Sequence, residues 1–353
     1  MLMSQIHTLV VSDFVTASGF RHDPTLTYQL YGRELGTAPV VLVNHALTGN
    51  SSVTGAQGWW NDLIGDNKII DTGRYTILAF DIPGNGFSQI DEKLTDNYQE
   101  FTLRDIARIF LSGLSELKIK RLFAIIGGSI GGALAWEIAA LKPDVTEHLI
   151  PIATDWKASD WLIANVRIQK QILQHSDSPL QDARMHAMTF YRSAASLKQK
   201  FARSKHAELD LFNVESWLQH HGDKLEQRFA LASYKLLNHL LATGDITDGT
   251  GDFEGTVADF DANIHLIGID SDGFYINSEN YDTLEKLLAV GKPAKLGIIN
   301  SIHGHDAFLI EYQQLIDFLQ PVFAGAKDLD VYANSKRNSS SFGVTDNSLE
   351  WCA

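Results

Sequence analysis

A short glycine-rich segment between an apolar run and a helical pattern constrains the fold of this chain more than any other feature. Residues 122–126 (Leu-Phe-Ala-Ile-Ile) have the length and composition of a buried strand, and apolar residues recur at helical spacing from Ala133 onward. Between them, Ser129 lies in a Gly-x-Ser-x-Gly pattern with Gly127 and Gly131. A serine in a sharp strand-to-helix turn needs small neighbours, and the start of the helix directs free N–H groups at a nearby charge. The pattern therefore predicts a nucleophilic Ser129; the alternative is a purely structural turn.

Strand and helix patterns alternate on both sides of this segment. Strand-like runs occur at residues 25–31, 39–43, 75–80, 122–126 and 147–153, with a helical pattern at residues 102–117. This alternation predicts an α/β protein with a mainly parallel sheet and helices on both faces.

The alternation stops after Thr154 and resumes near the C-terminal end. Residues 156–248 contain helical patterns, including 161–173 and 223–241, without a strand pattern. Strand patterns return at residues 264–269 and 294–299, and a closing helix is expected over residues 306–323. We therefore predict a core formed by residues 1–155 and 249–325, with residues 156–248 inserted as a helical cap. Residues 326–353 are polar and are predicted to be a disordered tail.

An acid and a base follow the last two predicted strands. A serine hydroxyl needs a base to accept its proton, and that base needs a third group to orient it. Asp270 and Asp272 follow one strand, and His303 and His305 follow the other. The order serine, acid, histidine is that of the α/β-hydrolase fold. Either aspartate can be the acid at this point, and His305 is favoured as the base because it directly precedes the closing helix. A metal site at His303 and His305 is not expected, because no third cluster of ligands accompanies the pair.

An acyl-transfer site also needs two donors for the oxyanion. The N–H of Ile130 follows the nucleophile, and the second donor is expected in the polar loop after Val43, at Leu47 or its neighbour Ala46. His45 in the same loop is expected to brace the loop and not to act as a base.

The composition excludes several classes of partner. The chain carries 29 basic and 43 acidic residues, a net charge of −14, which disfavours nucleic acid and anionic membranes. Its single cysteine, Cys352, excludes an internal disulfide. We find no signal-peptide pattern and no 18-residue apolar run. The expectation is a cytoplasmic enzyme that acts on small molecules.

The chain resembles the homoserine O-acetyltransferase family of α/β hydrolases. The matching blocks extend from about residue 26 to 320 and include His45-Ala46-Leu47-Thr48-Gly49, residues 127–132, residues 268–272 and Gly304-His305-Asp306-Ala307-Phe308-Leu309. The cap contributes residues 191–193, 214–218, 232–234 and 244–246.

The resemblance implies a site and a reaction. The triad would be Ser129, Asp272 and His305, with the N–H groups of Leu47 and Ile130 as oxyanion donors. Acetyl-CoA would acylate the serine as a co-substrate, and the hydroxyl of L-homoserine, or of a similar hydroxy amino acid, would then accept the acetyl group. Neither a metal nor a bound organic cofactor is implied. Family members usually form dimers through the cap, so the resemblance suggests a homodimer; the alternative is that the apolar face of the cap packs on the core.

The resemblance also suggests substrate-binding residues. Lys170 stands where the family commonly has an arginine suited to a carboxylate, Arg167 lies one turn earlier, and Asp306 would face the substrate amine. A lysine is a point charge and does not replace the bidentate arginine fork. Residues 81–88 and the short link at residues 176–179 also depart from the family pattern.

Two other functions stay open at this point. A serine hydrolase would use the same residues with water as the acceptor, and a non-catalytic relative would act as a binding module. A cap that forms a deep tunnel would favour transfer, whereas an open cleft would favour hydrolysis.

Overall fold

The protein is built around one large, mainly parallel sheet. The computed structural model describes residues 5–88 and 91–324. The sheet has eight strands in the order β1-β4-β8-β5-β9-β10-β11-β12. The strands are β1 (His7–Val10), β4 (Thr25–Gly32), β5 (Val40–Asn44), β8 (Thr76–Phe80), β9 (Leu122–Gly128), β10 (Thr146–Ile152), β11 (Asn263–Ile269) and β12 (Ala294–Ile299). β4 pairs antiparallel with β1 and β8, and the strands from β8 to β12 pair in parallel. This is the predicted sheet, with β1 as an additional edge strand.

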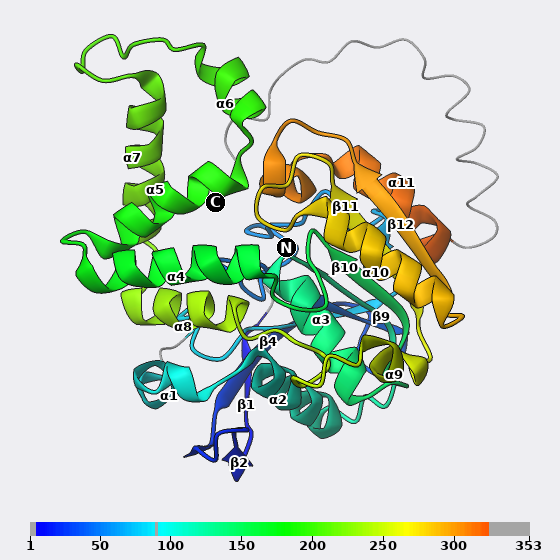
Figure 1. Ribbon diagram of the computed structural model, residues 1–353. Helices are drawn as coiled ribbons and strands as arrows, with labels where there is room; N and C mark the ends of the chain where they lie inside the picture. Colours follow the sequence, from blue (N-terminus) through cyan, green and yellow to red (C-terminus); the bar gives the residue numbers. More distant parts are fainter. Residues whose placement is uncertain (1–4, 89–90, 325–353) are drawn as a thin grey trace, which may run out of the picture.

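Two apolar cores lie on the two faces of this sheet. Side chains of β9 alternate between them, because successive residues of a strand point to opposite faces. Ile125 joins a core with α2 (Leu103–Glu116) and α3 (Ile130–Leu141), whereas Ile126 joins one with α11 (Tyr312–Phe323). Helices therefore cover both faces, as the alternating pattern predicted (Figure 1).

The segment between β10 and β11 is mostly helical. Five helices, which we call the cap, lie beside the sheet and are drawn in green and yellow-green in Figure 1. They are α4 (Asp160–His175), α5 (Pro179–Tyr191), α6 (Ala194–Phe201), α7 (Asn213–Glu226) and α8 (Leu231–Leu241). The other elements are β2 (Phe14–Val15), β3 (Arg21–His22), β6 (Ile64–Gly65), β7 (Ile70–Asp71), α1 (Glu92–Asp96), η1 (Tyr98–Glu100), α9 (Phe253–Ala258), α10 (Asn277–Ala289) and η2 (Gly304–Leu309).

Two predicted helices differ from the structure. The pattern over residues 223–241 is not one helix, because α7 ends at Glu226 and α8 begins at Leu231. The turn between them lets Arg228 donate a hydrogen bond of 3.2 Å to Thr48 O, in the loop after β5. The predicted closing helix over residues 306–323 is likewise two elements, the 3₁₀ helix η2 and then α11. The sequence indicated neither break, because apolar residues continue at helical spacing across both.

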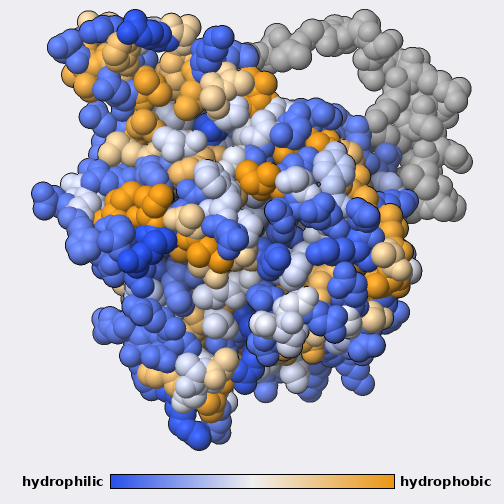
Figure 2. All heavy atoms as spheres, in the orientation of Figure 1, coloured by the Kyte–Doolittle hydropathy of each residue, from blue (hydrophilic) through white to orange (hydrophobic). Residues whose placement is uncertain are grey.

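The surface in this orientation is mainly hydrophilic, with apolar side chains interspersed over the cap (Figure 2). Trp161, Ile163 and Ile168 on α4 are among the exposed large apolar residues. The cap homodimer stays a prediction. Across the described residues, no helix combines the length and the apolar composition that crossing a bilayer requires. The predicted tail, residues 326–353, lies outside the described residues.

Candidate active site

The turn between β9 and α3 holds Ser129 in an uncommon backbone conformation. Ser129 has φ 57° and ψ −128°, a positive φ that a non-glycine residue adopts only where the surrounding structure enforces it. Its N–H donates to Ile152 O at 2.9 Å, which ties the turn to β10. The serine side chain therefore stands at the carboxyl end of the central strands, where parallel α/β sheets place their sites.

Close backbone contacts explain the two glycines of the pattern. A Cβ at Gly127 would lie 2.5 Å from the Gly131 backbone, and a Cβ at Gly131 would lie 2.5 Å from Asn44 O. Neither position has space for a side chain, because backbone atoms form the obstacle. The sharp turn and the neighbouring β5 loop can approach only with glycine at both positions.

Asp272 and His305 form a buried pair near this turn. Asp272 Oδ2 lies 2.7 Å from His305 Nδ1, and the two side chains are 1% and 5% exposed. The second oxygen, Asp272 Oδ1, accepts hydrogen bonds from the N–H groups of Phe274 and Tyr275 at 2.7 and 2.9 Å. Both carboxylate oxygens are thus engaged, which fixes the acid and, through it, the histidine ring.

Aromatic rings enclose His305 and connect it to the nucleophile turn. Tyr275 stacks on the imidazole with 5.7 Å between ring centroids, and Phe308 contacts it edge-on at 5.6 Å. The Phe308 ring also packs on Gly128, where an added Cβ would lie 2.4 Å from it. Phe308 therefore lies between His305 and Gly128, the residue that precedes Ser129. Within the described residues the Ser129 side chain forms no hydrogen bond, and such contacts often tighten only when substrate is bound.

The two alternatives left open by the sequence have separate positions. Asp270 Oδ1 accepts a hydrogen bond of 3.0 Å from Ser301 N and so braces the loop after β12. His303 Nδ1 lies 3.2 Å from Arg192 Nη1, a residue of the cap. Asp270 and His303 thus lie beside the pair in sequence, but each is engaged elsewhere.

The loop after β5 is held by a neutral histidine. Burial lowers the pKa of His45, Nδ1 lies 2.8 Å from Ala46 O, and Nε2 accepts from Ile82 N at 2.9 Å. Only a neutral ring with its proton on Nδ1 satisfies both contacts. His45 therefore braces the loop, as expected, and places Leu47 at the pocket described next.

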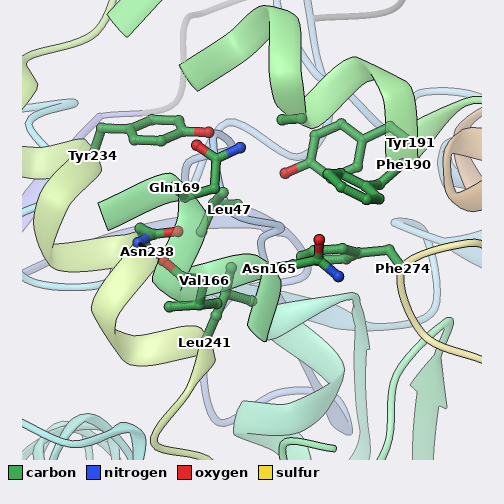
Figure 3. A pocket seen from close by; sticks show the side chains of 11 residues that line it. Leu47, Asn165, Val166, Gln169, Phe190, Tyr191, Tyr234, Asn238, Leu241 and Phe274 are labelled. Atoms are coloured by element: carbon green, nitrogen blue, oxygen red, sulfur yellow. Dashed lines mark hydrogen bonds between the residues drawn. The ribbon is translucent and has the colours of Figure 1, made fainter. Parts of the chain in front are cut away.

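A pocket lies between the cap and the aromatic residues around His305, and we call it the cap pocket. The core contributes Leu47 and Phe274, and the cap contributes residues of α4, α5 and α8, among them Asn165, Gln169, Tyr191, Tyr234 and Asn238. Phe274 and Tyr191 both contact the His305 ring, with centroids 5.2 and 5.6 Å away. In Figure 3 the hydroxyls of Tyr191 and Tyr234 and the amide of Gln169 point into this space. The cap pocket thus extends from the rings that contact His305 to the helices of the cap.

The predicted substrate-binding residues are only partly brought together. Asp306 is buried and forms an ion pair with Arg192, whose Nε lies 3.2 Å from its Oδ2. Burial raises the pKa of Asp306, and the charges of Arg192 and Arg184 oppose this rise. Arg167 is exposed, and Lys170 lines a different hollow on the far side of Val166. Gln169 lines the cap pocket, and the next residue of a helix lies about 100° further around its axis. The side chain of Lys170 therefore points away from the cap pocket.

Several residues at the site were missed by sequence reasoning. Arg184 is 4% exposed, and its guanidinium lies 5.6 Å from the centre of the Tyr191 ring. A signal was present in the sequence, because Arg184 and Tyr191 are seven residues apart and so lie on one face of α5. Asn165 and Gln169, and likewise Tyr234 and Asn238, are four apart and place polar groups on otherwise apolar helix faces.

Known proteins support this description of the fold and family. Residues 39–206 match the model of the α/β hydrolase fold family. A homoserine O-acetyltransferase of Chloroherpeton thalassium is 32% identical over 298 residues, covering 78% of this chain and 77% of that protein. The crystal structure of homoserine O-acetyltransferase from Bacillus anthracis superposes with a TM-score of 0.82 at 20% identity, covering 92% and 99% of the two chains. That of esterase E22 does so with a TM-score of 0.79 at 17% identity, covering 90% and 100%. The fold alone therefore does not distinguish transfer from hydrolysis.

Proposed function

This chain belongs to the homoserine O-acetyltransferase family, and from that membership we propose that it transfers an acetyl group from acetyl-CoA to the hydroxyl of L-homoserine. The chain is thus an acyltransferase built on an α/β-hydrolase scaffold. One observation carries the proposed mechanism: in a buried Asp272–His305 pair, 2.7 Å apart and close to the strained turn that holds Ser129, the imidazole contacts two aromatic residues that line a pocket under the cap.

The first half of the proposed reaction acylates the serine. His305 Nε2 accepts the proton of Ser129 Oγ as this oxygen attacks the thioester carbonyl, and Asp272 stabilises the imidazolium that results. The tetrahedral intermediate collapses, the C–S bond breaks, and His305 returns the proton to the CoA thiolate. The products of this half are the acetyl ester of Ser129 and free CoA thiol.

The second half transfers the acetyl group to the amino acid. His305 removes the proton of the homoserine hydroxyl, and this oxygen attacks the ester carbonyl. The bond to Ser129 Oγ then breaks, and the proton passes from His305 to the serine. The net exchange is acetyl-CoA and homoserine for CoA and O-acetylhomoserine, and Ser129 is regenerated.

In both halves an oxyanion forms and needs donors. Ile130 is the first residue of α3, so its N–H has no acceptor within the helix. Leu47 borders the cap pocket on a loop that His45 holds in place. These positions support the N–H groups of Ile130 and Leu47 as the donors.

A zwitterionic acceptor needs one cation and one anion beside the base. Asp306 directly follows His305 and supplies the anion for the ammonium group. Arg184 is a buried cation whose guanidinium lies 5.6 Å from the centre of the Tyr191 ring, and its charge opposes the rise that burial causes in the pKa of Asp306. We assign the carboxylate of the acceptor to Arg184, in place of Lys170 and Arg167.

The test is release of free thiol from acetyl-CoA, with and without L-homoserine, with the product identified by mass. We expect release of thiol that depends on homoserine and yields O-acetylhomoserine. Ser129→Ala should give neither thiol release nor O-acetylhomoserine. Release at the same rate without homoserine would make water the acceptor and the protein a hydrolase. No acyl transfer from acetyl-CoA to homoserine or to any other hydroxy amino acid would reject the proposal.

A further inference from the structure

A second hollow in the cap carries positive charge in an otherwise acidic protein. It lies between α4 and α8, beside η1, and we call it the lysine hollow; Lys170, Gln174, Lys235 and His239 line it. Among the described residues that line it, none is an aspartate or glutamate. Lys170 and Lys235 are only partly exposed, and within the described residues neither ammonium forms a hydrogen bond or an ion pair. Two unpaired lysines in one hollow repel each other, and a bound anion would remove that cost.

The lysine hollow adjoins the cap pocket. The two share Val166 of α4 and Asn238 of α8, and Asn238 Nδ2 donates a hydrogen bond of 3.2 Å to Val166 O between them. At its other end the cap pocket reaches Leu47 and the rings that contact His305. The order of features is therefore the triad, the cap pocket, the Val166–Asn238 contact, and then the two lysines.

The cap pocket itself is suited to a neutral chain that carries N–H groups. None of the described residues that line it is charged. Asn165, Gln169 and Asn238 each donate their side-chain NH₂ to a backbone carbonyl of the cap, at 2.9, 3.0 and 3.2 Å. These bonds leave the amide oxygens as the groups that can accept from a ligand, and the buried Gln169 Oε1 has no partner within the described residues.

We infer that the lysine hollow binds phosphate groups of the acyl donor. The amide-containing arm of the donor then lies in the cap pocket and delivers the thioester to Ser129. Lys170 and Lys235 are point charges that pair with phosphate oxygens without needing a fixed fork geometry. This inference rests on the proposed use of a CoA thioester, and it gives Lys170 a role at the donor end, not at the acceptor carboxylate.

The experiment compares donors that differ in their phosphate groups. Acetyl-CoA, S-acetyl-4′-phosphopantetheine and S-acetylpantetheine are supplied with homoserine to the full chain and to the Lys170→Gln/Lys235→Gln variant. Lys198→Gln/Lys224→Gln is the matched control, because it removes two exposed charges from other cap helices, α6 and α7. Binding of CoA is measured in parallel by titration calorimetry, which needs no turnover.

The preference for acetyl-CoA over S-acetylpantetheine is the ratio of their kcat/KM values. We expect this ratio to be about tenfold lower in the Lys170/Lys235 variant than in the wild type, because the KM for acetyl-CoA rises. CoA should bind about tenfold more weakly to this variant, and the wild-type affinity should fall more steeply with salt. S-acetyl-4′-phosphopantetheine carries a single phosphate. If its kcat/KM also falls in the Lys170/Lys235 variant, this phosphate is the one that the hollow recognises.

Equal CoA affinity in the wild type and the Lys170/Lys235 variant would overturn the inference, and so would an equal wild-type kcat/KM for acetyl-CoA and S-acetylpantetheine. In either case, transfer to homoserine by the wild type would leave the proposed function intact. Absence of transfer in the wild type, with lysine-dependent CoA binding retained, would instead reject the proposed acceptor and support the hollow.

Discussion

Asp272 Oδ2 lies 2.7 Å from His305 Nδ1, whereas Asp270, two residues earlier, accepts a backbone N–H from the following loop. This difference predicts unequal effects of the same substitution. Asp272→Asn should lower kcat/KM by roughly 10³-fold, because an amide neither stabilises the imidazolium nor selects its tautomer. Asp270→Asn keeps the oxygen that accepts from Ser301 and should change kcat/KM less than about threefold. Steady-state kinetics decides between the two acids, with circular dichroism to check that both variants are folded. A larger loss of kcat/KM in Asp270→Asn than in Asp272→Asn would reverse the assignment.

The turn around Ser129 predicts a large effect of a single methyl group. In Gly131→Ala the new Cβ would lie 2.5 Å from Asn44 O, so the backbone of α3 or of the β5 loop must move. We expect a loss of about 2–3 kcal/mol in the free energy of unfolding, measured with urea. Gly273→Ala is the control, because the nearest atom to its Cβ would be Phe190 O at an ordinary 3.5 Å. Equal stability of the two variants would show that the turn is not constrained as described.

The buried carboxyl group of Asp155 should make the stability of the folded protein depend on pH. It is 5% exposed, its Oδ2 has no hydrogen-bond partner within the described residues, and burial raises its pKa to about 6. Its pKa in the unfolded chain is about 4, so the folded state binds more protons between pH 4 and 6 and loses stability as pH rises through that window. Asp155→Asn should therefore be more stable than the wild type at pH 7.5, by about 2–3 kcal/mol at most, with the difference shrinking toward pH 4.

Urea unfolding of both proteins at several pH values measures this difference. The variant keeps an oxygen to accept from Trp156 N and Thr283 Oγ1, which lie 2.7 and 3.2 Å from Asp155 Oδ1. A difference that does not change between pH 4 and 7.5 would mean that Asp155 does not titrate in this range.

The ion pair between Arg192 and Asp306 predicts a shift in a pH profile. Burial raises the pKa of Asp306, and the charge of Arg192 limits that rise. Arg192→Gln should raise this pKa further, so Asp306, which we propose binds the acceptor ammonium as a carboxylate, would become protonated at a higher pH. The acid limb of kcat/KM for homoserine should move upward by about one pH unit, with activity recovering as pH rises.

The control for Arg192 is an exposed arginine of the same cap, in Arg167→Gln. It should leave the profile in place, because Arg167 is exposed and its charge is not among those that act on the Asp306 carboxyl. An unchanged acid limb in Arg192→Gln would indicate that Asp306 ionisation does not control acceptor binding.

Much of the fold follows from patterns that are local in the sequence. The apolar run 122–126 becomes β9 because it is buried on both faces, and its alternating side chains supply both cores. The order of strands and helices, and the polar loops at the strand ends, were correctly predicted for the same reason. The breaks near Arg228 and Ile310 were not predicted, because apolar residues continue at helical spacing across both.

The residue types of the site and their order along the chain were determined by the sequence alone: a serine between glycines after β9, aspartates after β11 and histidines after β12. The tertiary structure decided which aspartate and which histidine meet, since both candidates in each pair share one loop and differ only in the direction of the backbone. It also decided that Arg192 pairs with Asp306, and that Lys170 lines a separate hollow. Periodicity assigns a residue to a helix face, but the packing of the cap on the core determines what that face meets.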